Sequence, residues 1–233
     1  MSNYLIITGG SRGIGEKTIA CFIQNGWQAI NISRKPCDLP QVINISIDLS
    51  SSANVQKNAE KLQACIKEKG IISLVHNAAF YKRDSLDSLS LLDLQHTLET
   101  NVISPIALNQ IFIPYMKPGS SIIYIGSTLS EKAVPGSASY VISKHALIGL
   151  MRTTCQDLIG KDIRTCCICP GLVDTTILRE TMDESTINML IDSKIIGKRL
   201  IEPQEIADVI HFCATSTVMN GSTIHANLGH IAD

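Results

Sequence analysis

Short apolar runs recur along the chain, and segments whose apolar residues have helical spacing separate them. The runs are rich in Ile and Val and do not alternate with polar residues, a pattern typical of strands buried on both faces of a parallel sheet. They are Tyr4–Thr8, Gln28–Ile32, Val42–Ile47, Ile71–Val75, Ser121–Ile125 and Ile163–Ile168. A last short strand is predicted around Thr223–Ala226.

The intervening segments predict helices that cover this sheet. The first helix follows Gly13 and ends at Asn25-Gly26, a sequence typical of a left-handed cap. Between the third and fourth strands we expect one helix ending at Gly70, with an apolar stripe formed by Val55, Ala59, Leu62 and Ile66. Further helices are predicted over Leu91–Tyr115, over Ser139–Ile159 and from Pro203 onward.

The alternation of strands and helices predicts an α/β fold, a single-domain Rossmann-type doubly wound parallel sheet with helices on both faces. The length of 233 residues fits one domain, and no linker, repeat or low-complexity segment marks a boundary. We expect residues 1–120 mainly to bind a nucleotide and residues 121–233 mainly to supply catalytic and substrate groups. In such a sheet, ligands bind at the carboxyl ends of the strands.

Composition narrows the class of protein further. A net charge of −1 offers no electrostatic footprint for nucleic acid or an anionic membrane. The N-terminus has no basic flank or cleavage site of a signal peptide, and no apolar stretch reaches the roughly 20 residues that span a bilayer. A cytoplasmic protein is therefore expected, with its eight cysteines reduced and mostly buried. Cys166, Cys167 and Cys169 lie on one predicted strand, whose side chains alternate between faces, so no metal site is expected there.

A glycine-rich loop lies between the first strand and the first helix, with the sequence Thr8-Gly9-Gly10-Ser11-Arg12-Gly13-Ile14-Gly15. Glycines at this point allow a tight turn and let backbone N–H groups approach a pyrophosphate. No Gly-Lys-Ser/Thr sequence follows, which excludes a Walker loop. The loop therefore predicts a dinucleotide site.

The second strand ends in Ser33-Arg34-Lys35, where an NAD-specific site usually has an acidic residue for the ribose 2′-hydroxyl. Arg34, together with Arg12 from the glycine loop, is suited to bind a 2′-phosphate. The sequence thus favours NADP(H), with NAD(H) as the alternative. In the plainer interpretation both arginines are solvated surface residues.

Tyr140 and Lys144 are spaced i and i+4, on one face of a predicted helix. A nearby cation stabilises a phenolate and lowers the tyrosine pKa, which suits the pair to proton transfer. Ser127 follows the fifth strand, at the edge where ligands are expected, and its hydroxyl can bind a substrate oxygen. Asn101 lies within a helical stretch although Asn is a poor helix former, and a side-chain hydrogen bond that bends the helix is one explanation.

Taken in order, these motifs resemble the classical short-chain dehydrogenase/reductase family over nearly the whole chain. The matching segments are Thr8-Gly9, Gly13-Ile14-Gly15, Asp48-Leu49, His76-Asn77-Ala78-Ala79, Asn101, Ser127, Tyr140 with Lys144, and Pro170-Gly171-Leu172-Val173-Asp174-Thr175. Their joint order and spacing are far more specific than any single motif.

The resemblance implies roles for these residues. Tyr140 would exchange a proton with the substrate oxygen, Lys144 would hold the nicotinamide ribose and lower the tyrosine pKa, Ser127 would orient the substrate, and Asn101 would position a water. Asp48 and Leu49 would contact the adenine, with Asn77 and Ala78 around it. The nicotinamide carboxamide and the phosphates would be met by Pro170, Gly171, Val173 and Thr175. With the residues of the glycine loop and Ser33 and Arg34, these form the expected cofactor site.

The chain departs from the family pattern in two places. Ala79 stands where the family has glycine, so the cofactor path is expected to shift slightly. The tail Asn227-Leu228-Gly229-His230 replaces the usual Asp-Gly-Gly. His76 invites a catalytic interpretation, but a hydrogen-bonded structural histidine at the end of a buried strand is the expected state.

We expect a reductase of carbonyl compounds, or an alcohol dehydrogenase in reverse, with a small-molecule substrate. Alternatives are an NADP(H)-binding sensor without turnover and a sugar-nucleotide enzyme of the family's extended branch, which would need a larger C-terminal domain. The apolar segment Thr176–Lys198 is expected to form a lid over a partly apolar substrate, or else simply to pack on the core. A homodimer or homotetramer through the helix bearing Tyr140 is expected from the family.

Overall fold

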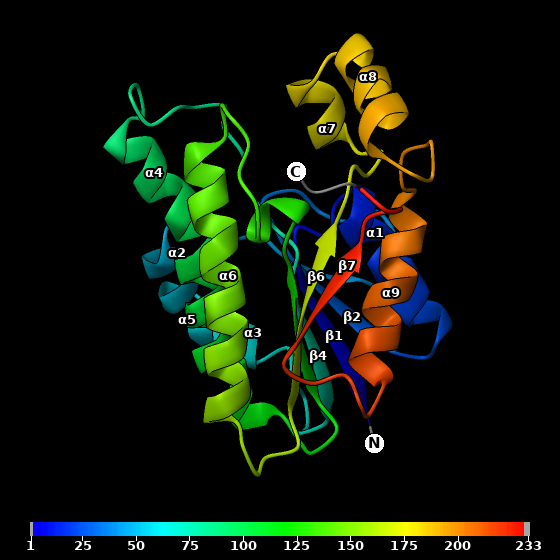
Figure 1. Ribbon diagram of the computed structural model, residues 1–233. Coiled ribbons are helices and arrows are strands. Elements are labelled where there is room, and N and C mark those ends of the chain that lie inside the picture. The colour runs from blue at the N-terminus through cyan, green and yellow to red at the C-terminus, as the bar shows by residue number, and fades with distance from the viewer. Residues whose placement is uncertain (1, 231–233) are drawn as a thin grey trace.

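The computed structural model describes residues 2–230, and its centre is a seven-stranded parallel sheet in the order β3-β2-β1-β4-β5-β6-β7. Figure 1 shows these strands, which are β1 Asn3–Thr8, β2 Gln28–Ile32, β3 Ile43–Ile45, β4 Ile71–His76, β5 Ser121–Ile125, β6 Arg164–Pro170 and β7 Ser222–Ala226. The predicted doubly wound parallel sheet is thus confirmed. The third strand is shorter than predicted because only Ile43–Ile45 pairs with β2, at the edge of the sheet.

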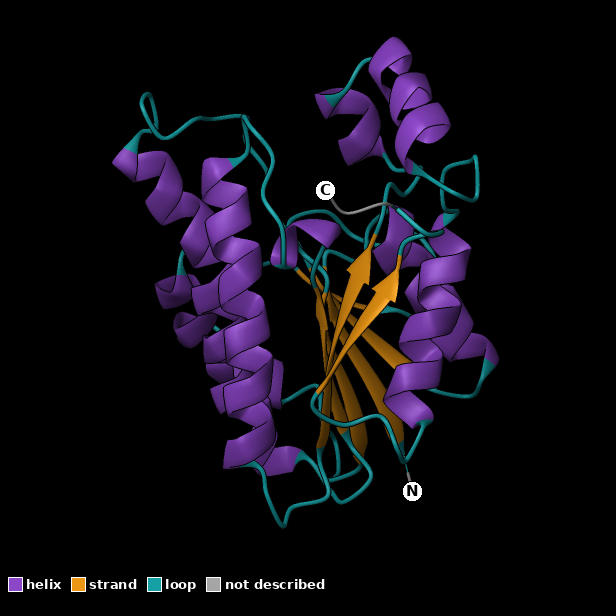
Figure 2. Ribbon diagram, viewed as in Figure 1, coloured by secondary structure: helices purple, strands orange, loops and turns teal. Residues whose placement is uncertain are grey.

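Helices cover both faces of the sheet, as Figure 2 shows. One face carries α1 (Gly13–Gln24) and α9 (Pro203–Thr215). The other carries α2 (Ser52–Lys57), α3 (Ala59–Gln63), α4 (Leu91–Leu98), α5 (Ser104–Phe112) and α6 (Ala138–Asp157). The remaining helices, α7 (Thr176–Thr181) and α8 (Glu184–Lys194), lie beyond the carboxyl ends of the strands (Figure 1).

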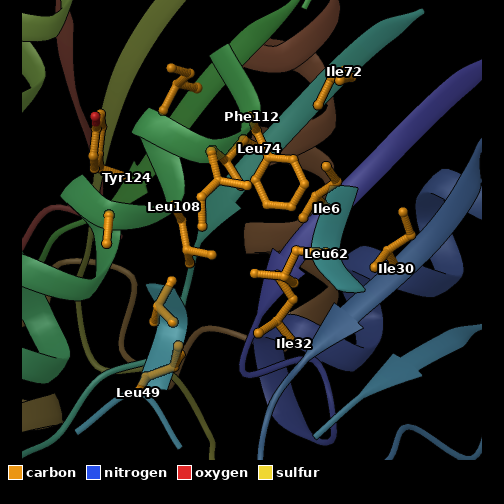
Figure 3. Close-up of a cluster of buried hydrophobic side chains, with 14 of the residues drawn as sticks. Ile6, Ile30, Ile32, Leu49, Leu62, Ile72, Leu74, Leu108, Phe112 and Tyr124 are labelled. Atoms are coloured by element: carbon orange, nitrogen blue, oxygen red, sulfur yellow. The ribbon is translucent and has the colours of Figure 1, made fainter. Parts of the chain in front are cut away.

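Each face of the sheet has its own apolar core. Toward α2–α6, residues of alternate strand positions such as Ile6 and Ile32 pack against Leu62, Leu108 and Phe112, as Figure 3 shows. Toward α1 and α9, the intervening strand residues form a second buried cluster. All positions of β5 and β6 are buried, which explains why these strands appear in the sequence as continuous apolar runs.

We predicted one continuous helix between the third and fourth strands, and this prediction is wrong. The helix breaks at Asn58 into α2 and α3, and the side chain of Asn58 donates to the Asn54 carbonyl over 2.8 Å. Val55 and Leu62 are still fully buried, so the apolar stripe was correctly placed. Ser and Asn side chains compete with the backbone for hydrogen bonds, which accounts for a break that apolar spacing does not reveal.

Gly70 is not the C-cap of that helix, because α3 ends at Gln63. Gly70 instead pairs with Met116 beside the sheet, and a Cβ atom there would lie 2.3 Å from the Ser2 carbonyl oxygen. Close backbone approach, and not helix termination, therefore explains this glycine. The cap predicted for α1 is confirmed, since Gly26 follows the helix with a φ of 80°.

The long helical stretch predicted over Leu91–Tyr115 is divided in the structure. After α4 comes a π-helical segment, Glu99–Ile103, then α5, and finally a 3₁₀ turn at Ile113–Tyr115. After β6 the chain forms only α7, α8, α9 and β7, so no further domain follows within residues 2–230. Within the same residues, no helix is long and apolar enough to cross a membrane.

Candidate active site

The predicted site residues gather at one edge of the sheet, where the parallel strands end. Thr8 is the last residue of β1, Pro170 the last of β6, and Asn77 follows β4 directly. Ser33 follows β2 and Ser127 lies two residues beyond β5. Residues from across the sequence are therefore brought to the same edge by the parallel arrangement.

The glycine loop has the shape that a pyrophosphate requires. Gly9 and Gly13 have φ values of 68° and 58°, in the region that favours glycine. A Cβ on Gly15 would lie 2.2 Å from the Gly9 carbonyl oxygen, so only glycine fits where the loop approaches α1. No side chain caps the N-terminus of α1, where Ser11, Arg12 and Ile14 complete the loop, and this leaves the first N–H groups for an anion.

Asn77 fixes the glycine loop from the neighbouring strand. Its side-chain amide donates to the carbonyl oxygens of Thr8 at 3.1 Å and Gly9 at 3.0 Å. The Thr8 hydroxyl in turn accepts from the backbone N–H groups of Asn77 and Ala78, each at 3.0 Å. The Asn77 side chain thus shapes the glycine loop.

The segment after β2 contains no helix, and it exposes Arg34. Arg12 is also exposed and lies 3.9 Å from Glu180 of α7. Asp48 accepts from the backbone N–H of Ser50 at 3.0 Å, and this bond, with the nearby Arg34 charge, lowers the pKa of Asp48. Cations and a hydrogen-bonded carboxylate therefore surround the place where the adenosine half of a dinucleotide is expected.

Tyr140 and Lys144 lie one turn apart on α6, facing the carboxyl ends of β5 and β6. The Lys144 ammonium donates to the Ile125 carbonyl oxygen over 2.7 Å and lies 5.3 Å from the centre of the Tyr140 ring. Lys144 is only 2% exposed. The structure thus brings together the phenol and the ammonium that the sequence pairs.

Burial dominates the proton affinities of this pair. It raises the pKa of Tyr140 to about 12, although a hydrogen bond with Ser127 lowers that pKa in part. Burial also lowers the pKa of Lys144 to about 8, while the thiols of Cys167 and Cys169 oppose this shift. We expected Lys144 to lower the tyrosine pKa. In this structure desolvation outweighs any such effect, and the phenol is held in its protonated form.

Ser127 is fixed by a short turn. Its hydroxyl accepts from the Leu129 N–H at 3.1 Å, while the Ser130 hydroxyl accepts from the Ser127 N–H at 3.1 Å. A hydroxyl has one proton and two lone pairs, so Ser127 can also donate, and its hydrogen bond with Tyr140 lowers the pKa of that phenol because Ser127 donates to the phenolate oxygen. The preceding Gly126 is required, because a Cβ there would lie 2.8 to 2.9 Å from Ser130, Cys167 and Cys169.

Asn101 lies in the π-helical segment and is 1% exposed. Its side chain accepts from the Phe80 N–H at 2.7 Å and donates to the Phe80 carbonyl at 3.0 Å and to the Ser143 hydroxyl at 2.9 Å. These bonds occupy the side chain, so a water at this point would be held by the Asn101 backbone. The π-helical turn supplies a carbonyl outside the regular helical pattern.

Two further residues, which the sequence did not identify, shape the site. The Tyr81 ring packs edge-on against Tyr140, with ring centres 5.2 Å apart, and its hydroxyl is 3.2 Å from that of Ser137. Asp84 accepts from the backbone N–H of Ser139 at 3.0 Å and so caps α6 at its start. Because Asp84 and Ser139 are 55 residues apart, no local capping signal was available.

The departures from the family pattern have structural explanations. The side-chain NH₂ group of Asn109 donates to the Tyr124 hydroxyl, which leaves the side-chain oxygen of Asn109 facing His76. An amide oxygen can only accept, so His76 Nε2 donates to it over 2.8 Å. Burial lowers the pKa of His76 to about 4, which confirms a neutral structural histidine. Ala79 is not among the described residues with positive φ, so its methyl group causes no backbone strain there. In the tail, Asn227 accepts from the Gly229 N–H at 3.0 Å.

The segment expected to form a lid is built from α7 and α8. Ile177, Met189 and Ile196 are exposed, whereas Ile187 and Ile195 are buried. Part of the segment thus packs and part presents apolar side chains. Cys166 lies in the core on the opposite face from Cys167 and Cys169, and in the described residues no group of His, Cys, Asp or Glu is placed to hold a metal.

Comparison with known proteins agrees with this geometry. The sequence model of the family described as enoyl-(acyl carrier protein) reductase matches residues 10–230. A 3-oxoacyl-(acyl-carrier-protein) reductase of Thermotoga maritima is 27% identical over 235 residues, covering 94% of each chain. Carbonyl reductase family member 4 of Danio rerio is 28% identical, covering 96% of each chain.

A solved structure of a short-chain dehydrogenase family protein from Francisella tularensis superposes with a TM-score of 0.87 at 27% identity, over 98% of both chains. The chain belongs to the short-chain dehydrogenase/reductase family. It is accordingly an oxidoreductase of a family that binds nicotinamide cofactors and acts on small molecules.

Proposed function

We propose that this protein is an NADP(H)-dependent carbonyl reductase that uses Tyr140 as its general acid. The observation that carries the proposal is the Tyr140 phenol, bonded to Ser127 and beside the buried Lys144, at the sheet edge that also bears the glycine loop. A nucleotide cradle and a proton donor are thus placed side by side. Residues 1–120 mainly provide the cradle and residues 121–233 the reacting groups.

The residues of the site suit carbonyl reduction. The bound nicotinamide would supply a hydride to the carbonyl carbon. When a substrate is bound, the Ser127 hydroxyl would turn its proton to the carbonyl oxygen and so orient the substrate beside Tyr140. Tyr140, with a pKa of about 12, is a neutral phenol at physiological pH and can give its proton to the oxygen as negative charge develops there. The Lys144 ammonium then stabilises the phenolate that remains.

The preference for NADP(H) rests on charge at the end of β2. Ser33 and the exposed Arg34 stand where an acidic residue would bind the ribose 2′-hydroxyl of NAD, and the glycine loop adds a second exposed cation, Arg12. Asp48 and Leu49 would contact the adenine, and Gly171, Val173 and Thr175, which follow β6, would contact the nicotinamide. NAD(H) remains the alternative cofactor.

The substrate we propose is a partly apolar ketone or an acyl-type carbonyl compound. The exposed Ile177 and Met189 of α7 and α8 supply apolar surface above the site. Two relatives carry names that fit this class, a 3-oxoacyl-(acyl-carrier-protein) reductase and a carbonyl reductase. Short-chain dehydrogenases typically assemble, so we also propose a homodimer or homotetramer. The eight free cysteines fit a reducing cytosol.

The test is a thermal-shift comparison of NADPH with NADH, followed by a panel of ketones, 3-oxoacyl thioesters, acids and sugar phosphates. A ligand that binds only the native state raises the melting temperature, so NADPH is expected to give the larger shift. Ketones or thioesters should then oxidise NADPH, followed by its absorbance. A larger shift with NADH would refute the cofactor, and a preference for sugar phosphates would refute the substrate class.

A further inference from the structure

Two asparagine side chains lie beneath the loop that follows β2, and the proposed reaction does not use them. Asn31 of β2 and Asn44 of β3 are paired across the parallel strands. The Asn31 amide donates to the Asn44 side-chain oxygen over 2.8 Å. Asn31 is 1% exposed, so this polar group is buried and bonded at the edge of the cofactor site.

Asn31 joins the two cofactor loops. Its side-chain oxygen accepts from the Gly10 N–H at 2.9 Å, while its amide donates to the Ser33 hydroxyl at 3.0 Å. A Cβ on Gly10 would lie 2.6 Å from that oxygen, so the contact requires glycine. A single amide group therefore sets the distance between the glycine loop and the turn that carries Ser33 and Arg34.

Asn44 fixes the far end of the same turn. Its side-chain oxygen accepts from the Cys37 N–H at 2.8 Å, and its amide donates to the Cys37 carbonyl at 3.0 Å. Cys37 is 3% exposed, whereas Arg34 and Lys35 are exposed. The turn is thus anchored at both ends, and its cations face solvent between the anchors.

We infer that Asn31 and Asn44 are positioning residues for a ribose 2′-phosphate, which hold Ser33 and Arg34 at a fixed distance from the glycine loop. The inference rests on the proposed NADP(H) preference. A loop that is already ordered does not lose its freedom on binding, and so it binds more tightly. NADH has no 2′-phosphate and gains nothing from that order.

The two asparagines differ in a way that makes the inference testable. Within residues 2–230, the Asn44 side chain bonds only to Asn31 and Cys37, both in or beside the Ser33 turn. Asn31 also bonds to Gly10 of the glycine loop, which both cofactors would contact. Loss of Asn44 should therefore weaken NADPH alone, whereas loss of Asn31 should weaken both cofactors.

The experiment is calorimetric titration of wild-type protein and Asn44→Ala with NADPH and with NADH. We expect NADPH to bind about tenfold more weakly to the variant, equivalent to about 1.4 kcal/mol, and NADH affinity to change less than about twofold. Asn44→Thr also lacks the amide, but threonine is favoured in β-strands. It should show the same changes in affinity as Asn44→Ala, and it serves as the second variant in case Asn44→Ala misfolds. Asn58→Ala, which removes a similar exposed amide between α2 and α3, is the matched control and should change neither affinity.

Amide hydrogen exchange gives a second readout without cofactor. The Cys37 N–H should exchange faster in Asn44→Ala, because its acceptor is gone, while the glycine loop keeps its protection. Equal weakening of both cofactors, or unchanged NADPH affinity, would overturn the inference. A wild-type protein that binds NADH as tightly as NADPH would instead overturn the cofactor assignment itself, and the two failures are thereby distinguished.

Discussion

At the scale of single residues, the site combines a proton donor that keeps its proton with a cation that is close to losing one. Burial raises the pKa of Tyr140 to about 12 and lowers that of Lys144 to about 8. The neutral phenol suits reduction, since the oxygen of a reduced carbonyl is a strong base. The ammonium, however, is the group whose charge changes within the working pH range.

This arrangement predicts how reduction depends on pH. Because the folded pKa of Lys144 is about 8, its charge is present below that pH and disappears above it, while Tyr140 stays protonated throughout. We expect kcat/KM for carbonyl reduction to be constant from about pH 6 to pH 7.5 and to fall above about pH 8. Lys144→Arg, which stays charged, should lose this decline. A flat wild-type profile up to about pH 10 would contradict the assignment.

Most of the site was predictable because its signals are local in the sequence. These signals are the glycine loop, the i and i+4 spacing of Tyr140 and Lys144, and the position of Ser127 after a strand. Tyr81 and Asp84 were not predictable, since their partners Tyr140 and Ser139 on α6 lie more than fifty residues away in the sequence. The pKa balance was not predictable either. It depends on burial, and the i and i+4 spacing shows only that the two groups are neighbours.

At the scale of elements, the π-helical segment Glu99–Ile103 joins α4 to α5 and places Asn101 against the loop after β4. A strong helix former such as alanine in place of Asn101 would leave the Phe80 N–H and carbonyl without the Asn101 side chain as their hydrogen-bond partner. The sequence indicated an irregularity, because Asn is unfavourable within a helix, but the partner residue could be seen only in the fold.

Asn101→Ala tests this element. The change removes bonds to the Phe80 N–H, the Phe80 carbonyl and the Ser143 hydroxyl, all largely shielded from water. We expect the free energy of unfolding to fall by about 1–3 kcal/mol in urea titration, because buried groups lose their partners. Asn58→Ala, at the exposed break between α2 and α3, should cost less. Equal losses for the two variants would contradict the structural role of Asn101.

At the scale of the whole molecule, apolar periodicity was sufficient to predict the parallel sheet and its strands, since fully buried strands leave long Ile- and Val-rich runs. Apolar periodicity was insufficient for the order of the strands in the sheet, which we did not predict. It was also insufficient for helix continuity around Asn58 and for the role of Gly70, where hydrogen bonding and backbone contact decide. The exposed apolar residues on α4 and α6 would be covered in the assembly that we propose. They include Leu91 and Leu92, each 78% exposed, and Ile142 at 42%.

Light scattering tests the assembly. We expect the mass of a dimer or tetramer of the 25.3 kDa chain. Ile142→Glu should shift the protein toward monomer, because a buried charge without a partner is costly at an interface. Ile159→Glu, at a position 74% exposed beyond the end of α6, is the control and should leave the assembly intact. A wild-type monomer would refute this part of the account.

The most direct test of the central claim is the turnover of NADPH with a reactive ketone by wild-type protein and Tyr140→Phe. Loss of the general acid should lower kcat/KM by about 10²–10⁴-fold, while NADPH affinity stays within about twofold of wild type. Measurable wild-type turnover that Tyr140→Phe retains in full would contradict the account, and so would negligible turnover in both.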